Sequence, residues 1–318
     1  MIRYLLACLS FVFYTFLGFS DVILAGRSKE IDVSFWKMQS AKIEEKILIQ
    51  KKAEVFATTR SQEILYFGGT LDTKGCVWEK NLKTGQINAA FLKDSAVIYA
   101  FCWLQDNTLV AAGTHPNLGG GIWRKAKGGD WSDFEPLPNS TVIYCLTLGP
   151  NGVLFAGGSY RGKGKVWAWD QNSWNQGECL NQAKEICTLC VAKGIVYAGG
   201  QKDSLTGGFW EFDGKTWNAG SDLKFSSAIY ASAVSKDGVV YLAGAGEKFI
   251  WENGQGFWNS ISLDHCLSIY AISMDTNGLA CAAGWNNQHT GSVWTQDVKK
   301  KWSKAISIPD CFVVRGIA

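Results

Sequence analysis

Short runs of alternating apolar and polar residues recur along most of the chain, with polar turns between them. One kind of run ends in glycine, and a second kind contains the pair Ile-Tyr. The glycine-ended runs lie at residues 64–69, 109–113, 154–158, 196–200, 240–244 and 280–284, and the Ile-Tyr runs at 97–101, 142–146, 228–232 and 268–272. Alternation with a period of two places side chains on the two faces of a strand, so the pattern predicts β-strands throughout.

A tryptophan follows each glycine-ended run, and five copies add a second tryptophan seven or eight residues later. The first set comprises Trp78, Trp123, Trp167, Trp210, Trp251 and Trp294, and the second comprises Trp131, Trp174, Trp217, Trp258 and Trp302. Turns such as Asn151-Gly152 and Asp213-Gly214 separate neighbouring runs, because Asn and Gly tolerate the positive φ that hairpins need. We name the four strands of a copy A (the Ile-Tyr run), B (the glycine-ended run), C (the first tryptophan) and D (the second).

A period of roughly 40–45 residues with four strands per copy is the signature of a β-propeller blade. We therefore predict an all-β fold of four-stranded antiparallel blades. The strand C tryptophans are expected to be structural residues of the core, since a buried Trp hides about 150–250 Å². Trp36 occupies the same position in a shorter copy near the N-terminus and joins this set.

Both ends of the chain contain part of a copy. Residues 21–26, 33–37 and 46–50 fit strands B, C and D, and no strand A precedes them. Residues 311–318 fit a strand A. We predict that the C-terminal strand pairs with the N-terminal strands and closes a ring of seven blades, which leaves no open sheet edge. The alternative is six blades with disordered ends.

Residues 1–20 combine Arg3, an apolar run over 4–17 and small residues up to Ser20, which is the pattern of a secretory signal peptide. Cleavage near Ser20 would leave residues 21–318 as a single β-propeller domain, secreted or periplasmic and monomeric. The alternative is an uncleaved membrane anchor, and contact with a membrane is expected only in that case.

The net charge of +3 and the lack of a basic run disfavour a nucleic-acid partner. Nine of the ten cysteines would remain after cleavage, an odd number that prevents complete pairing. We interpret most of them as small apolar core residues. Cys266 and Cys311 occupy equivalent positions in neighbouring copies and could form a disulfide. We predict neither a metal site nor a cofactor.

The order of a Gly-Gly doublet, an aromatic residue and a later Trp resembles kelch-type propellers, which include the central domain of galactose oxidase. Gly199-Gly200, Trp210 and Trp217 follow this order, as does the copy at 157–174. The resemblance covers residues 52–308 and implies a propeller that mainly binds partners, although such a fold hosts many functions.

Patterns that would support catalysis are incomplete. A copper oxidase needs clustered His and Tyr ligands, but His115 and His289 lie in loops of copies that are not neighbours. Residues 212–217 (FDGKTW) resemble the Asp-box turn of sialidases, but they are one residue short, and an Asp-Gly β-turn explains them. A glycosidase or oxidase is therefore the third hypothesis for function.

The B–C loops differ most between copies and emerge on the same face as the D–A loops; we call this face the B–C face. Binding residues usually lie on loops of a rigid scaffold. The predicted binding residues are His115, Asn117, Tyr160, Arg161, Asp203, Trp285, Asn286, Asn287 and His289. The first hypothesis is a non-enzymatic module that recognises a protein partner through this face. The second is carbohydrate binding, with Trp285 or Tyr160 stacking on sugar rings.

Overall fold

The computed structural model describes residues 8–9, 22–28, 32–39, 42–247, 249–254, 256–275 and 277–318. Nearly all regular structure in these residues is β-strand, and a short 3₁₀ turn, η1 (Pro150–Gly152), is the helical element among them. The alternating pattern therefore predicted the secondary structure correctly, and the chain is all-β.

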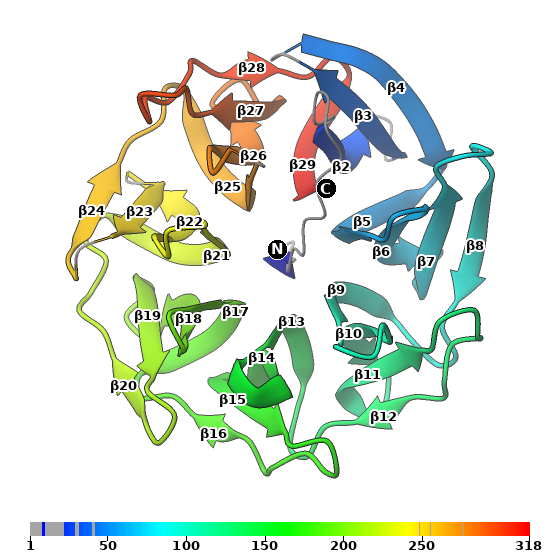
Figure 1. Cartoon of the computed structure of the whole chain (residues 1–318), viewed down its shortest axis with the longest axis vertical. Coiled ribbons are helices and arrows are strands. Elements are labelled where there is room, and N and C mark those ends of the chain that lie inside the picture. Colours follow the sequence, from blue (N-terminus) through cyan, green and yellow to red (C-terminus); the bar gives the residue numbers. More distant parts are fainter. Residues whose placement is uncertain are drawn as a thin grey trace.

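The strands are arranged in groups around a ring. Within each group, strands A, B, C and D follow one another from the axis outward (Figure 1). The inner A strands are β5 (Ala53–Arg60), β9 (Val97–Trp103), β13 (Val142–Leu148), β17 (Ala183–Ala192), β21 (Ser226–Val234), β25 (Cys266–Met274) and β29 (Cys311–Ile317). The B strands are β2 (Val22–Ser28), β6 (Ile64–Leu71), β10 (Leu109–His115), β14 (Leu154–Tyr160), β18 (Ile195–Lys202), β22 (Val240–Gly246) and β26 (Ala280–Asn286). The C strands are β3 (Val33–Gln39), β7 (Lys74–Asn81), β11 (Gly119–Lys125), β15 (Lys163–Trp169), β19 (Gly207–Phe212), β23 (Ile250–Asn253) and β27 (Gly291–Thr295). The outer D strands are β4 (Lys42–Gln50), β8 (Ile87–Phe91), β12 (Glu135–Pro136), β16 (Glu178–Cys179), β20 (Trp217–Ala219), β24 (Trp258–Ile261) and β28 (Ile306–Ser307).

The C-terminal strand completes the sheet that the N-terminal strands begin. β29 pairs antiparallel with β2, from Leu24 opposite Ile317 to Ser28 opposite Cys311, and the sheet runs β29-β2-β3-β4 (Figure 1). Ile23 and Ala318 extend this ladder with two backbone hydrogen bonds of 2.7 Å. The predicted closure of the ring by the two ends of the chain is confirmed.

The number of blades rests on one pair of residues. Hydrogen bonding divides the described strands into six sheets, and one of these has eight strands. That sheet consists of the groups β21–β24 and β25–β28, which are joined through Ala245 opposite Ser268. If the pair Ala245–Ser268 links two separate blades, the structure has the seven blades expected from the repeat. The number of blades therefore stays an interpretation.

A further short strand, β1 (Cys8–Leu9), pairs in parallel with β9 and lies on the axis of the ring among the inner strands (Figure 1). It belongs to the segment predicted as a signal peptide, and the rest of that segment is outside the described residues, so cleavage near Ser20 stays a prediction. Among the residues that the structure describes, no helix has the length and apolar character needed to cross a membrane.

The strand C tryptophans are buried between the sheets. Six of them are at most 1% exposed, namely Trp36, Trp78, Trp123, Trp167, Trp210 and Trp294, and Trp251 is 7% exposed. Four donate the indole N–H to a backbone carbonyl in the turn that enters strand A of the same copy: Trp123 to Lys93 (3.0 Å), Trp167 to Pro138 (2.7 Å), Trp210 to Asn181 (3.0 Å) and Trp294 to Asp264 (3.0 Å). Each of these tryptophans therefore fills a layer between sheets and also fixes the start of an inner strand.

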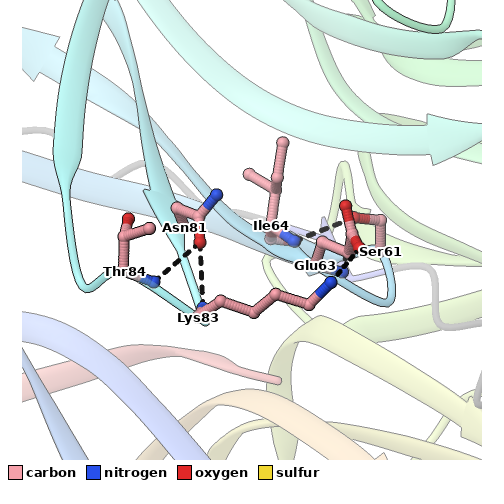
Figure 2. A network of polar contacts seen from close by, with 6 residues as sticks. All are labelled: Ser61, Glu63, Ile64, Asn81, Lys83 and Thr84. Atoms are coloured by element: carbon pink, nitrogen blue, oxygen red, sulfur yellow. Dashed lines mark hydrogen bonds and ion pairs between the residues drawn. The ribbon is translucent and has the colours of Figure 1, made fainter.

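The A–B and C–D turns lie on the face opposite the B–C face and are held by short polar contacts. Figure 2 shows one case, in which the Asn81 side chain accepts the N–H groups of Lys83 and Thr84 at 2.9 Å, while the Lys83 ammonium pairs with Glu63 of the adjoining turn. Asp213 has the same role, because its carboxylate accepts two backbone N–H groups, which lower its pKa. The FDGKTW motif is thus a capped β-turn.

Cys266 and Cys311 are free thiols, so the predicted disulfide is wrong. Cys266 packs between the groups β21–β24 and β25–β28, beside Trp294, whereas Cys311 packs in the next layer, beside Trp36. Equivalent residues of neighbouring copies lie in successive layers with a whole sheet between them, and two such cysteines therefore cannot meet. Burial raises the pKa of both thiols.

We expect Trp210→Ala to lower the free energy of unfolding by about 3–5 kcal/mol, because it empties a buried site. Trp210→Phe keeps most of the ring but removes the donor to Asn181, at a cost of about 1 kcal/mol beyond the loss of volume. Trp78→Phe is the matched control, since the Trp78 indole N–H has no hydrogen-bond partner among the described residues. Urea denaturation of the three variants measures these differences; equal losses in the two Phe variants would show that the N–H bond contributes nothing.

Candidate functional site

Every inner strand contains a β-bulge at the same place, close to the loop that enters it. At each bulge one residue of strand A has no partner opposite it on strand B, and we call it skipped. The skipped residues are Phe56, Tyr99, Tyr144, Cys187, Tyr230, Tyr270 and Arg315. A bulge redirects a side chain out of the regular alternation of a strand. We call these residues the axial ring.

The last glycine of each glycine-ended run, which lies near the end of strand B, makes the bulge possible. A Cβ added at Gly200 would lie 2.0 Å from the Glu185 carbonyl oxygen, on the strand beside it. The corresponding distance is between 1.9 and 2.1 Å in the other copies, at Gly26, Gly69, Gly113, Gly158, Gly244 and Gly284. The preceding position, Gly199 in this copy, is alanine in others such as Ala112. The second glycine of the doublet is therefore the one that the fold requires.

Contacts between inner strands show that the ring faces the axis. Phe56 and Tyr99 meet edge to face with centroids 5.2 Å apart, and Tyr99 meets Tyr144 in the same way at 5.5 Å. Tyr230 and Tyr270 stack with their planes only 8° apart. Cys187 of β17 shares a hydrophobic cluster with Tyr270 of β25, although β21 lies between these strands. The axis is thus lined mainly by aromatic side chains.

A charged group interrupts the aromatic lining at the sheet β29-β2-β3-β4, which closes the ring. Arg315 is 7% exposed, and its guanidinium lies 4.6 Å from the centre of the Phe56 ring. Its Nη1 is 3.7 Å from Glu54 Oε2, while the other oxygen of Glu54 accepts a hydrogen bond of 2.8 Å from Arg27. Burial lowers the pKa of Arg315, which Glu54 raises and Arg27 lowers. One carboxylate therefore serves two arginines.

Burial also governs the tyrosines of the ring. It raises the pKa of Tyr99 to about 12, with a lowering contribution from Arg315. It raises the pKa values of Tyr144 and Tyr230 as well, and the carboxylate of Glu185 adds to both. These phenols are therefore neutral at physiological pH and can act as hydrogen-bond donors.

His115, one of the predicted binding residues, stabilises the β10–β11 turn. His115 Nδ1 accepts the backbone N–H groups of Asn117 and Leu118, both at 3.0 Å, and its ring packs against Phe134 with centroids 4.9 Å apart. These contacts fix the β10–β11 turn and use the Nδ1 atom of the imidazole as an acceptor. Asn117 is exposed at the tip of the same turn.

Four of the predicted residues lie together on the β26–β27 turn. Asn286 is 2% exposed, and its side-chain oxygen accepts the N–H groups of Gln288 and Thr290, so it also stabilises a turn. Asn287 and His289 are exposed, and the rings of His289 and Trp285 meet edge to face with centroids 5.4 Å apart. Half-buried Trp285 shares a hydrophobic cluster with the ring residues of β21 and β25 and therefore adjoins the axial ring.

The remaining predicted residues lie on other copies around the ring (Figure 1). Arg161 covers the ring of Tyr160 at 5.0 Å. Asp203 forms an ion pair of 3.0 Å with Lys163 of the neighbouring group. The structure therefore distributes the predicted residues over four turns of the B–C face, at β10–β11, β14–β15, β18–β19 and β26–β27.

Two residues of the B–C face were missed by the sequence analysis. Leu205 is 58% exposed with a φ of 62°, and Phe225 is 61% exposed with a φ of 69°. A bulky apolar residue rarely adopts positive φ. The strands next to these two turns are linked, since the Gln201 side chain of β18 donates to the Ser227 carbonyl of β21 at 3.0 Å. We call Leu205 and Phe225 the apolar turn pair.

An alignment of the D–A turns would have revealed Phe225. In six of the seven copies the position five residues before the axial residue has positive φ, and apart from Phe225 it is polar, namely in Asp94, Asn139, Gln182, His265 and Asp310. In the copy of Phe56 the positive φ falls one residue later, at Lys52. Asp and Asn tolerate this conformation far better than Phe does. Phe225 is an exposed aromatic residue at this position, where a polar residue is usual, and its side chain does not stabilise the turn conformation.

We expect Gly200→Ala to lower the free energy of unfolding by about 3 kcal/mol, because the new methyl group would overlap a backbone carbonyl. Gly199→Ala is the matched control; its methyl group would meet side chains of Ile229 and Thr188, which can adjust. Thermal and urea denaturation measure both. A Gly200→Ala protein as stable as the control would disprove the requirement for glycine at the bulge.

The raised pKa of Tyr99 predicts a loss of stability in alkali. The neutral phenol is favoured in the folded state, so its contribution is complete below the ordinary pKa of 10 and is lost as the pH rises toward about 12. Tyr99→Phe has no proton to lose, and we expect its free energy of unfolding to fall less over this range. Denaturation curves measured between these pH values test this, and parallel slopes for the two proteins would contradict it.

No family model and no curated protein matches the sequence. Solved structures do resemble the fold. A selenomethionine-substituted virginiamycin B lyase from Staphylococcus aureus has a TM-score of 0.67 at 12% identity, over 82% of this chain and 93% of that chain. The WD40 β-propeller domain of Doa1 has a TM-score of 0.64 at 13% identity, over 87% and 90% of the two chains. A functionally unknown protein from Desulfotomaculum acetoxidans has a TM-score of 0.66 at 12% identity, over 94% and 98%. Identities this low show the β-propeller fold alone, and the kelch-type resemblance stays a prediction.

Proposed function

We propose that the protein is a secreted or periplasmic binding module that recognises a protein partner through its B–C face, with the apolar turn pair at the centre of the contact. The ring of sheets supplies a rigid support for the loops of this face, and such loops commonly carry binding residues. Leu205 and Phe225 are the two apolar residues among the described non-glycine residues of positive φ, and this departure is what the proposal rests on.

The conformation of Leu205 and Phe225 is the observation that carries the proposal. Both side chains are more than half exposed, so neither gains the stabilisation that burial gives an apolar residue. Both also bear the cost of positive φ, which such residues retain mainly at functional sites. Leucine and phenylalanine side chains gain free energy when a partner protein covers them, and aromatic residues are enriched in interfaces.

The two alternatives have weaker support. Stacking on a sugar needs an open ring face, but Arg161 and Lys165 both lie against the Tyr160 ring. An enzyme acting at the axis would need several acids there, but the described inner strands carry only two, Glu54 and Glu185, and Glu54 is held by Arg27. The lyase among the structural neighbours carries out its own reaction, and at 12% identity this gives no assignment for the present chain.

The test compares binding and stability in one variant. Leu205→Asn with Phe225→Asn removes both apolar side chains, and Asn accepts positive φ more easily. We expect this variant to be as stable as the parent protein or slightly more stable, while capture of the partner from envelope and culture-medium fractions is lost. A gain in stability with a loss of binding is typical of residues kept for function.

The matched control changes Phe257 and Val298 to Asn. These residues are 56% and 86% exposed and lie on C–D turns, on the opposite face. We expect this protein to capture the same partner as the parent. Capture that survives in the B–C face variant, or that fails equally in the control, would overturn the proposal, and a glycan array with the parent protein would then test the second hypothesis.

A further inference from the structure

The most unusual polar group on the axis is Arg315. With β1 on the axis, its side chain is over nine-tenths buried, and Nε has no hydrogen-bond partner among the described residues. The contact with Glu54 is long, at 3.7 Å. An unsatisfied buried donor is costly, more so on a charged group. Within the protein, the donor capacity of this guanidinium is therefore only partly used.

Arg27 adds a second incompletely used guanidinium. Its Nη1 binds Glu54 at 2.8 Å, while its Nε is also buried without a hydrogen-bond partner in the described part of the chain. Two positive charges thus share one carboxylate. The surplus charge and the free donors favour an anion that can accept several hydrogen bonds, and a carboxylate matches the forked geometry of arginine.

The surroundings of the arginine pair are aromatic. Phe56 lies under Arg315 at 4.6 Å and Phe312 lies under Arg27 at 4.8 Å. Tyr99 continues the lining from Phe56 around the axis, and the stacked pair of Tyr230 and Tyr270 forms another part of it. Such a lining suits a flat apolar group with an offset or edge contact.

The axis also has room for a narrow occupant. In the structure β1 lies there as an extended segment beside β9. The sequence predicts that residues 1–20, which include β1, are removed on export. The processed chain would then expose the axial ring along the path that β1 occupies.

We propose that the axial ring of the processed protein binds an aromatic carboxylate, with the carboxylate held by Arg27 and Arg315 and the aromatic group among the tyrosines. This site uses none of the residues of the apolar turn pair, so it can fail while the proposed protein recognition holds, and the reverse. A free aromatic acid and the C-terminal residue of a peptide share this chemistry.

The experiment uses the protein as a cell exports it, with its N-terminus determined by mass spectrometry. Calorimetry compares N-acetyl-phenylalanine with its neutral amide and with N-acetylglycine, which lacks the ring. We expect the acid to bind at least about tenfold more tightly than either. A peptide with a C-terminal phenylalanine, in free and amidated forms, shows whether a chain end is accepted as well. Equal affinity for acid and amide, or no binding of the acid, would overturn the proposal.

Two matched variants separate charge from folding. Glu54→Gln removes the carboxylate that competes for the arginines, so we expect N-acetyl-phenylalanine to bind about tenfold more tightly than to the parent protein. Glu185→Gln makes the same change at the equivalent position, two residues before the bulge but beside the tyrosines and not the arginines, and we expect it to change the affinity much less than Glu54→Gln does. Weaker binding in Glu54→Gln would show that Glu54 helps to form the site and would contradict the anion assignment. If Glu54→Gln does not fold, the comparison of acid and amide in the parent protein still decides the matter.

Discussion

The close approach of one backbone carbonyl to one glycine is the contact on which the architecture depends. In every copy one glycine near the end of strand B lies where a Cβ would be 1.9–2.1 Å from a carbonyl oxygen of strand A. The approach accommodates the bulge, and the bulge turns one side chain of each inner strand toward the axis. The residue before each bulged one is Val or Ile, as at Ile98 and Ile143, and packs between sheets. The glycine contact thus keeps Val or Ile in the core at every bulge, while the next residue faces the axis and varies between copies.

The repeat also determines which residues can meet. Residues at the same position in different copies all point to the same side of their own sheet. Each of them therefore packs in a different layer between two sheets. This explains why each strand C tryptophan has a layer to itself, and why Cys266 and Cys311 do not pair. Contacts between equivalent residues become possible only on the axis, where the layers converge, as for Tyr99 and Tyr144.

Much of the fold could be predicted from the sequence because the period of two and the recurring Trp and Gly both report on backbone geometry. The closure followed from incomplete copies at residues 21–50 and 311–318. The site was harder to predict. His115 and Asn286 were chosen as polar loop residues, yet both cap turns, a role that depends on local hydrogen bonds. Arg315 was not among the predicted binding residues, because a bulge changes the facing of a residue without changing the spacing of the pattern.

The pairing of β2 with β29 has a consequence for how the chain folds. The layer around Leu24 and Trp36 is completed by Val314 and Ile317, so its two halves come from opposite ends of the chain. Until the last strand has been synthesised, β2 presents an unpaired edge, which any strand of matching pattern can occupy. Two incomplete rings can therefore exchange their final strands and become linked, as in domain swapping. Contacts of such high sequence separation also form slowly, so late closure is the step at which this protein is most exposed to misassembly.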